Sequence, residues 1–253
     1  MKNTILSAKN VSKSFAHNGT QVHVLSNVNL EIYKGDFTVI MGASGSGKST
    51  LLYALSGMDR ATAGEVIYNG KDISGMSEKE LALLRHRDLG FVFQAMHLVG
   101  NLSLKENICV AGYLNKSVKS SDVDSRADML IEKMSLTKVK DNMPGQVSGG
   151  EAQRCAIARA VINKPAILFA DEPTGALNRK NTKEVLNLFT ELNMEGQSIV
   201  MVTHDIKASV RADRIIYISD GNIISEISLP KYSGNEEKNR EIQVNSWLSS
   251  LEW

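Results

Sequence analysis

Short apolar runs separated by longer stretches with helical spacing dominate the chain. The runs are four to six residues long and rich in β-branched side chains, which is typical of buried strands. Their alternation with helical patterns predicts parallel strands joined by crossover helices, and therefore an α/β fold. The five runs cover residues 37–41, 90–93, 166–170, 198–203 and 214–219.

Two regions interrupt that alternation. Residues 5–15 and 22–32 alternate between apolar and polar side chains, so they predict an antiparallel sheet beside the parallel core. Between residues 94 and 148 the strand signal fades, and residues 104–114 and 123–134 have helical spacing instead. We expect a helical subdomain to interrupt the sheet here and to offer a surface on which a partner docks.

The last part of the chain has a different character. Residues 230–240 are polar and indicate a linker, which sets the expected domain boundary between residues 1–229 and residues 230–253. A terminal amphipathic helix packed on its own domain is favoured over a membrane or partner anchor. Four apolar side chains fall on one face of that helix: Val244, Trp247, Leu248 and Leu251.

Composition narrows the class of protein. The chain has 253 residues, with 29 basic and 28 acidic side chains and a net charge of +1, so it lacks the basic surplus typical of nucleic-acid-binding domains. Apolar runs fall short of the ~20 residues of a membrane helix, and the first residues lack the apolar stretch of a secretory signal. Cys109 and Cys155 are too few for a disulfide framework and have no metal-ligand spacing. We expect a soluble protein inside the cell, with reduced thiols and no nucleic-acid partner.

A glycine-rich loop, GASGSGKST, follows the predicted strand at residues 37–41 and leads into a helical pattern from Leu51. This is the setting of a P-loop, in which glycines let backbone N–H groups point at phosphate oxygens. Lys48 is expected to neutralise the β- and γ-phosphates, and the Ser49 hydroxyl to ligate Mg2+. The nucleotide-binding residues expected in the loop are Gly42, Ala43, Ser44, Gly45, Ser46, Gly47, Lys48, Ser49 and Thr50.

Two adjacent acids, Asp171 and Glu172, follow the apolar run at residues 166–170. Ligands of open parallel sheets bind beyond the carboxyl ends of the strands, so both acids are candidates for nucleotide chemistry. Successive strand residues face opposite ways, which predicts different roles for the two. We assign Asp171 to magnesium through a bound water, and Glu172 to orienting and deprotonating the attacking water. Solvated acids at the end of a buried strand are the alternative, which a P-loop in the same chain argues against.

A second anion-binding segment opens the helical pattern that runs to residue 162. A capping box explains its serine and glutamate, because each satisfies a backbone N–H group of the other. It does not explain two glycines in a first helical turn, each costing roughly 1 kcal/mol against alanine, whereas close approach of a ligand does. One triphosphate cannot easily fill both anion sites of one compact domain, so we expect a two-fold dimer in which each helix N-terminus covers the partner's nucleotide. The segment consists of Ser148, Gly149, Gly150 and Glu151.

Together these motifs resemble those of the ABC ATPases, with GASGSGKST as Walker A, VSGGE as the signature motif and ILFADEP as Walker B. The resemblance covers residues 5–226. It implies ATP and Mg2+ as cofactors. It also implies the ABC ATPase fold, which is a P-loop NTPase core with a parallel sheet, an antiparallel β subdomain and a helical subdomain, here at residues 95–160.

The resemblance gives roles to residues that are weak signals alone. Gln94, in FVFQ, is similar to the Q-loop glutamine, which senses magnesium and attacking water and couples to the membrane domain. His204, in VTHD, is similar to the switch histidine that contacts the γ-phosphate. Phe15 stands where the family has an adenine-stacking aromatic. Without the family, Gln94 and His204 read as ordinary polar residues at strand ends.

Two residues depart from the family pattern. The signature usually ends in glutamine, whereas Glu151 would repel a triphosphate unless its carboxylate points away, as its favourable interaction with the helix dipole predicts. Asn178 replaces the usual D-loop aspartate, which removes a charge and bears on the rate and on communication between nucleotide sites. An active ATPase is still expected, because the P-loop lysine, both strand-end acids and the switch histidine are present.

Within the family, the chain resembles the branch that includes MacB, LolD and BceA, and looks most like the bacitracin-resistance type, BceA. This resemblance implies a cytoplasmic subunit, peripheral on the inner face of the cell membrane, with a membrane permease and a second copy of itself as partners. Its implied role is to export, or protect against, antimicrobial peptides.

A regulatory ATPase of the cell-division type, FtsE-like and without transport, shares this branch and is the alternative. Soluble ABC proteins of the ribosome or of DNA repair fit less well, because they carry two ATPase domains or a long coiled-coil insertion. A small-molecule kinase on a P-loop leaves the SGGE segment unexplained.

Overall fold

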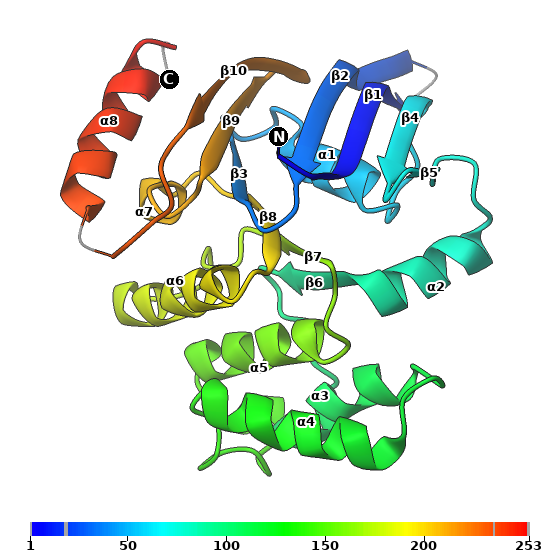
Figure 1. The fold of residues 1–253 in the computed structure, drawn as a ribbon, viewed down its shortest axis with the longest axis vertical. Helices are drawn as coiled ribbons and strands as arrows, with labels where there is room; N and C mark the ends of the chain where they lie inside the picture. The colour runs from blue at the N-terminus through cyan, green and yellow to red at the C-terminus, as the bar shows by residue number, and fades with distance from the viewer. Residues whose placement is uncertain (1, 18–19, 235, 252–253) are drawn as a thin grey trace. The chain divides into compact units, whose positions relative to one another are not determined.

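The computed structural model describes residues 2–17, 20–234 and 236–251, and the chain divides into two compact units. Residues 1–81 and 193–253 make up the first unit, and residues 82–192 the second. Figure 1 labels the helices and strands of both units.

An antiparallel sheet in the first unit has its strands in the order β2-β1-β4-β5 (Figure 1). The predicted strands at residues 5–15 and 22–32 are confirmed, and both are slightly longer than expected. β4 is short and buries few side chains, Val66 and Tyr68 among them, so its sequence carries little strand signal. The bounds are β1 (Thr4–His17), β2 (Thr20–Tyr33), β4 (Ala63–Tyr68) and β5 (Lys71–Asp72).

A parallel sheet in the first unit is built around β3 (Phe37–Met41). This strand pairs in parallel with β8 (Ser198–Val202) and with β9 (Arg214–Ser219). β10 (Asn222–Ser228) runs antiparallel to β9. Every residue of β3 and β8 is buried, which explains why their sequences are nearly continuous apolar runs. β3 and β9 have the bounds expected from the sequence, and the loop after β3 leads into α1 (Lys48–Leu55).

The second unit contains a parallel strand pair and the inserted helices. β6 (Leu89–Phe93) pairs with β7 (Ile167–Asp171), and the rings of Phe91 and Phe169 stack across the pair at 5.6 Å between centroids. α3 and α4 confirm the helical prediction for this segment. The helices of this part of the chain are α2 (Glu78–Asp88), α3 (Leu104–Tyr113), α4 (Ser120–Lys133), the 3-10 turn η1 (Pro144–Gln146), α5 (Gly149–Val161) and α6 (Arg179–Met194).

The C-terminal helix, α8 (Glu237–Ser249), packs on the first unit, to which it belongs. Val244 and Leu248 on its inner face are buried at 0% and 1% exposure. Trp247 adds a polar contact, because its Nε1 donates to Ser225 Oγ at 3.2 Å. The apolar face of the helix is therefore used within the chain.

The linker expected at residues 230–240 ends earlier than its polar sequence suggests. α8 begins at Glu237, and Arg240 in its first turn is only 3% exposed. The linker prediction was wrong for residues 237–240 because it rested on polar sequence alone, whereas the polar Arg240 side chain is buried and donates to backbone carbonyl groups inside the unit.

Neither membrane helices nor reactive thiols are present among the described residues. In residues 2–17, 20–234 and 236–251, no helix is long and apolar enough to cross a bilayer. Cys109 and Cys155 are buried free thiols, and burial raises the pKa of both, that of Cys155 to about 12. Both therefore stay protonated at neutral pH, where the thiol is a poor nucleophile.

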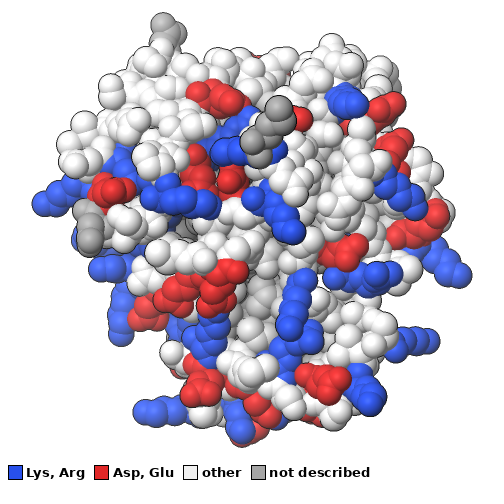
Figure 2. Space-filling view, in the orientation of Figure 1, with Lys and Arg blue, Asp and Glu red and all other residues white. Residues whose placement is uncertain are grey.

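Charged side chains of both signs are interspersed over the face shown in Figure 2. Exposed pairs of this kind are represented by Lys105 and Asp128, whose Nζ and Oδ1 atoms are 2.6 Å apart. Such pairs contribute about 0–1 kcal/mol each, so the stability of the fold depends on its buried strands and helices.

Three serine and glutamate pairs, each spaced three residues apart, form reciprocal hydrogen bonds at the start of a helix. In each pair the serine N–H and O–H groups donate to the glutamate carboxylate, and these hydrogen bonds lower the pKa of the carboxyl group. The carboxylate also faces the positive end of the helix dipole. The pairs are Ser77 with Glu80 before α2, Ser103 with Glu106 at α3, and Ser148 with Glu151 at α5.

Asn107, a fully buried side chain, organises the turn that leads into α3. Its amide nitrogen donates to the carbonyl oxygens of Val99, Leu102 and Ser103 at 3.1, 3.0 and 3.0 Å. Its Oδ1 accepts a hydrogen bond from the Val99 N–H group at 2.7 Å. A single side chain thus pairs with four backbone polar groups of the turn before α3, which is not part of a helix or sheet.

The Asn107→Leu substitution keeps the volume of the side chain but leaves these backbone groups without their partner. We expect the free energy of unfolding to fall by about 2–4 kcal/mol, measured by urea denaturation. Asn245→Leu, at an exposed position of α8, is the control and should change it by less than about 0.5 kcal/mol. Identical denaturation midpoints for Asn107→Leu and the unmodified chain would contradict the assigned role.

The capping boxes predict a pH dependence of stability. The folded pKa of Glu106 lies below its unfolded value, so its contribution is present above the unfolded pKa and is lost as the pH falls through the folded pKa. Glu106→Gln still accepts hydrogen bonds but carries no charge. We expect its melting temperature to be lower than that of the unmodified chain at pH 7, and the two to converge below pH ~4. Glu241→Gln, at an exposed position of α8, serves as the control; if it converges in the same way, the capping explanation is wrong.

Candidate functional site

The P-loop, residues 42–50, leaves the carboxyl end of β3 and turns directly into α1. Gly47 is the N-cap of this helix, with φ 99°, and no side chain caps it within the described residues. Gly42 admits no side chain, because an added Cβ would lie 2.1 Å from the Ile218 carbonyl oxygen. The helix begins at Lys48, three residues earlier than its apolar pattern predicts, so the lysine belongs to the first turn.

Lys48 and Ser46 give the loop the donors that a polyphosphate requires. The Lys48 side chain is nearly buried, and its Nζ donates to the carbonyl oxygens of Gly42 and Ala43 at 2.9 and 2.7 Å. The buried Ser46 hydroxyl has no hydrogen-bond partner among the described residues. A buried cation, an unsatisfied hydroxyl and an uncapped helix N-terminus all favour an anionic ligand, so the loop fits the phosphates of a nucleotide.

His204 lies at the same edge of the first unit's sheet as the P-loop. Ile40 of β3 is in register with Val202 of β8, so the residues after both strands emerge side by side. The His204 side chain is exposed. The carboxylate of the next residue, Asp205, caps the one-turn helix α7 (Ile206–Ser209) by accepting from a backbone N–H group at 2.8 Å.

Phe15, the candidate base-stacking residue, lies near the end of β1 in the first unit. Its ring is 43% exposed, and the Lys13 ammonium group lies 4.7 Å from the ring centroid. Lys13 is in turn held by Asp59, at 2.6 Å between Nζ and Oδ1. The ring therefore has a fixed cation near it and still exposes area for stacking.

In the second unit, Gln94 and the two acids come together at the carboxyl edge of β6 and β7. Phe93 is in register with Asp171, so Gln94 and Glu172 are the next residues along two neighbouring strands. The Gln94 side chain packs against Gly175, where an added Cβ would lie 2.9 Å from its Nε2. A larger residue at position 175 would therefore displace the Gln94 amide from this position.

Glu172 lies outside the strand, which corrects the expected reason for its separate role. β7 ends at Asp171, and Glu172 has φ 44°, in the left-handed region that bulky residues rarely adopt. Strand alternation therefore does not apply to Glu172, whose backbone has already left the strand. Non-glycine residues held in this conformation cost of order 1–3 kcal/mol and cluster at active sites.

The N-terminus of α5 contains the capping box that was one of two explanations for the SGGE segment. Ser148 N and Oγ donate to the Glu151 carboxylate at 2.8 and 2.7 Å, so the carboxylate turns back to the helix end. Gly150 is explained within the chain, because an added Cβ would lie 2.5 Å from Cγ of Asn181. Gly149 makes only ordinary contacts at 3.7 Å or more, which leaves it as the glycine that close packing does not require.

Asn178, the second departure from the family pattern, has a structural use in α6. Its Oδ1 accepts a hydrogen bond from the Asn181 N–H group at 3.0 Å, as an N-cap residue does. Asparagine and aspartate cap helices about equally well. The substitution therefore removes the charge of the usual residue without removing its capping function.

Two residues of α5 that the sequence did not single out hold the loop after Gln94. Arg159 donates to the carbonyl oxygens of Met96 and His97, both at 2.6 Å, and these two residues have φ values of 38° and 48°. Gln153, which is fully buried, donates to the Phe93 carbonyl oxygen at 3.2 Å. Polar residues on the apolar face of α5 were the available signal, because such residues need partners when buried.

Comparison with known proteins agrees with this geometry. The family model described as ABC transporter matches residues 25–175. The chain is 39% identical to the macrolide export ATP-binding/permease protein MacB of Pasteurella multocida over all 253 residues, which span 38% of that longer protein. The lipoprotein-releasing system ATP-binding protein LolD of Aquifex aeolicus is 42% identical, with 88% of this chain and 98% of LolD covered. The uncharacterized ATP-binding protein YvcR of Bacillus subtilis is 41% identical, with 98% and 93% covered.

Solved structures place the fold in the same family. The dimeric, post-hydrolysis ATP-binding cassette MJ0796 bound to ADP and Pi has a TM-score of 0.83 and 36% identity, over 90% of this chain and 100% of that one. The cbiO1 protein of Clostridium perfringens, part of the transporter complex cbiONQ, has a TM-score of 0.80 and 26% identity, with 96% of each chain covered. The chain therefore belongs to the ABC transporter family, in the branch of MacB and LolD, and it is an ATP-binding, ATP-hydrolysing protein of that branch.

Proposed function

We propose that this chain is the ATPase subunit of a MacB-like membrane transporter that exports, or protects against, antimicrobial peptides. The observation that carries the ATPase assignment is the P-loop, which combines the buried Lys48 ammonium group with a Ser46 hydroxyl and a helix N-terminus that have no side-chain partner in the part of the chain that the structure describes. The peptide substrate rests on resemblance to the BceA type alone. The chain spans about a third of the length of the MacB and PvdT relatives.

In the proposed site, residues 42–50 bind the phosphates of ATP and Phe15 stacks on its adenine. Ser49, Gln94 and Asp171 hold Mg2+, which supplies charge neutralisation to the phosphates when bound. This set provides hydroxyl, amide and carboxylate oxygens, which suit a hard cation that also keeps waters and phosphate ligands.

Glu172 is the general base of the proposed mechanism, and His204 contacts the γ-phosphate. The left-handed backbone at Glu172 supports this role, because strain of this kind is retained where a side chain must be aimed. Gln94 orients the attacking water together with Glu172. Its position beside Gly175, one strand away from the acids, supports this assignment.

A second copy of the chain completes each site in this proposal. Ser148, Gly149, Gly150 and Glu151 would cover the nucleotide bound by the partner subunit's P-loop. The dimeric form of the related cassette MJ0796 supports this arrangement. Glu151 does not oppose it, because its carboxylate is held by the Ser148 N–H and O–H groups at the helix end. Gly149, whose lack of a side chain close packing does not explain, places no Cβ between its backbone and a phosphate in this proposal.

The remaining partner is a membrane permease, which places the chain on the inner face of the cell membrane. A regulatory role with a cell-division membrane protein remains the second candidate, because it uses the same catalytic residues. The identity of the membrane partner separates the two.

The Glu172→Gln substitution tests the hydrolytic assignment. We expect ATP turnover to fall by about 10²–10⁴-fold, because the amide cannot accept the proton of the attacking water. ATP affinity should persist, and ATP should still drive dimerisation, measured by phosphate release and by size-exclusion chromatography with ATP. Glu191→Gln, an exposed carboxylate of α6, is the matched control. Undiminished turnover in Glu172→Gln would refute the assignment of the base.

Purification of the tagged chain from its native cell tests the transport assignment. Membranes are solubilised in mild detergent with ATP present, and the proteins that co-purify are identified by mass spectrometry. We expect a long permease with a large external domain. A short division-type membrane protein would replace the transporter with the regulatory function, and recovery without any membrane protein would refute both.

A further inference from the structure

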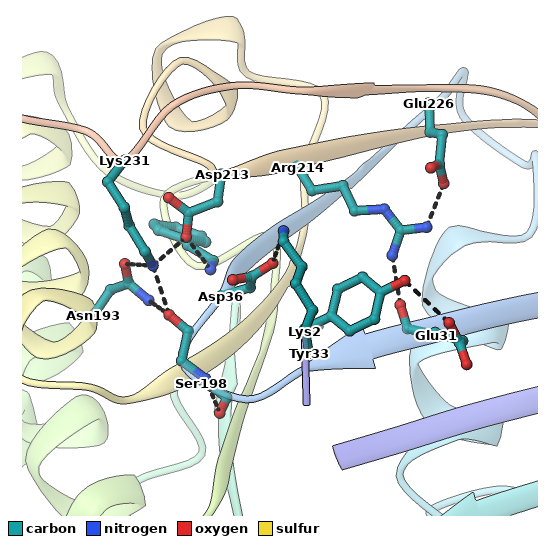
Figure 3. Close-up of polar contacts among 12 residues, drawn as sticks. Lys2, Glu31, Tyr33, Asp36, Asn193, Ser198, Asp213, Arg214, Glu226 and Lys231 are labelled. Atoms are coloured by element: carbon teal, nitrogen blue, oxygen red, sulfur yellow. Dashed lines mark hydrogen bonds and ion pairs between the residues drawn. The ribbon is translucent and has the colours of Figure 1, made fainter. Parts of the chain in front are cut away.

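The C-terminal strap, residues 229–250, is attached to the first unit by two basic side chains. Its first anchor is Lys231, whose Nζ donates to Asp213 Oδ2 at 2.6 Å and to the Gly35 carbonyl oxygen at 2.7 Å (Figure 3). The same oxygen of Asp213 accepts from the Phe37 N–H group at 2.8 Å. Lys231 therefore holds the strap at the residue that enters β9 and at the start of β3.

The second anchor is Arg240 of α8, which is 3% exposed. Its Nε, Nη2 and Nη1 atoms donate to the carbonyl oxygens of Val210, Ala212 and Pro230 at 2.5, 2.5 and 2.7 Å. The ring of Tyr232 lies 5.4 Å from its Cζ atom. One guanidinium group thus joins three separate backbone positions in a single plane, which a lysine cannot reproduce.

Burial of this cation is an expensive way to attach a helix. Among the described residues, Arg240 has no carboxylate within ion-pair distance, so its hydrogen bonds are to neutral carbonyl groups alone. Burial still disfavours the charged form and lowers the pKa of the guanidinium group, despite the longer-range attraction of Glu236 and Asp213, and apolar docking avoids this penalty. Val244 and Leu248 already supply apolar docking for α8. The arginine therefore has a use at the carbonyl groups that it binds.

Two of those carbonyl groups, of Val210 and Ala212, belong to the segment that follows His204. Val210 is the C-cap of α7, and Asp205 is its N-cap, so the helix directly adjoins the histidine. With four residues, α7 is a single turn, and isolated single turns are unstable because nucleation costs more than one hydrogen bond returns. At one end the Asp205 carboxylate accepts from the Lys207 N–H group, and just beyond the other end the Arg240 guanidinium binds the carbonyl oxygen of the C-cap residue, Val210, so both groups help to fix its conformation.

We infer that Arg240 is a positioning residue for hydrolysis: it fixes the far end of α7 and thereby the orientation of His204. The inference rests on the proposed role of His204 at the γ-phosphate. Arg240 contacts neither nucleotide nor metal in this scheme, so its loss should affect the catalytic step more than ATP binding. The strap becomes part of the catalytic apparatus although it lies outside the segment matched by the family model.

The test compares Arg240→Ala with Val244→Ala in the full chain with Mg2+ and ATP. Both substitutions loosen α8, but only the first releases the carbonyl groups after α7. We expect Arg240→Ala to lower kcat by about ten-fold with KM changed by less than about three-fold, since small displacements of a catalytic group cost this much. Val244→Ala should lower the melting temperature and leave kcat within about two-fold at temperatures where it is folded. Arg240→Lys, which keeps the charge and loses the planar fork, should have an intermediate kcat.

Hydrogen exchange gives a second readout that is independent of turnover. Amides of residues 206–210 should exchange faster in Arg240→Ala than in Val244→Ala, because only the former frees the end of α7. Equal kcat in the two variants, or unchanged exchange in this segment, would overturn the inference. If Arg240→Ala does not fold, Arg240→Lys decides the matter, and wild-type kcat with wild-type exchange in that variant overturns it.

Failure of the proposed function has a different signature. Full turnover in His204→Ala, or none in the unmodified chain, would remove the role assigned to the histidine, and with it the inference. Impaired His204→Ala together with normal Arg240→Ala would leave the ATPase mechanism intact and refute the positioning role alone.

Discussion

Backbone carbonyl groups in the loops that follow parallel strands are the constraint on which the rest of the structure depends. These carbonyl groups lie beyond the end of a strand, so they have no hydrogen bond to a neighbouring strand, and where they are buried a side-chain donor has to pair with them. Lys48 does this for the P-loop, Arg159 for the loop after Gln94, and Arg240 for the segment after His204. In each case the donor fixes a loop that carries a candidate catalytic residue, so the chemistry and the stability of the fold use the same hydrogen bonds.

The same constraint separates two kinds of buried cation in this chain. The Lys48 ammonium group is held by carbonyl groups of the glycine-rich P-loop and can exchange them for the charged oxygens of a phosphate. The guanidinium groups of Arg159 and Arg240 are held by two and three carbonyl groups in fixed planar geometry. Lysine is therefore used where a ligand replaces the carbonyl groups that it binds, and arginine is used where the hydrogen bonds to the carbonyl groups have to persist.

Much of the parallel sheet follows from the sequence because strands such as β3 and β8 are buried on both faces and have continuous apolar runs. The bounds of β3 and β9 agree with the predicted ones, and the P-loop was recognised from local spacing. Arg240 was missed because its partners are backbone atoms of residues 210, 212 and 230, whose proximity exists only after folding. The turn at Glu172 was missed for a related reason, since a left-handed glutamate has no signature in composition or periodicity.

The two departures from the family pattern change charge without changing helix geometry. Glu151 completes a capping box in which glutamine would accept the same two hydrogen bonds, and Asn178 accepts the bond that aspartate would accept. Compared with the usual family residues, Glu151 adds a negative charge at the N-terminus of α5, and Asn178 removes a negative charge from the N-terminus of α6. Because both helices still begin at their caps, the effect of these residues on turnover reduces to electrostatics at the two helix ends. The pKa of Glu151 is lowered by the Ser148 hydrogen bonds, so its charge is present throughout the neutral range.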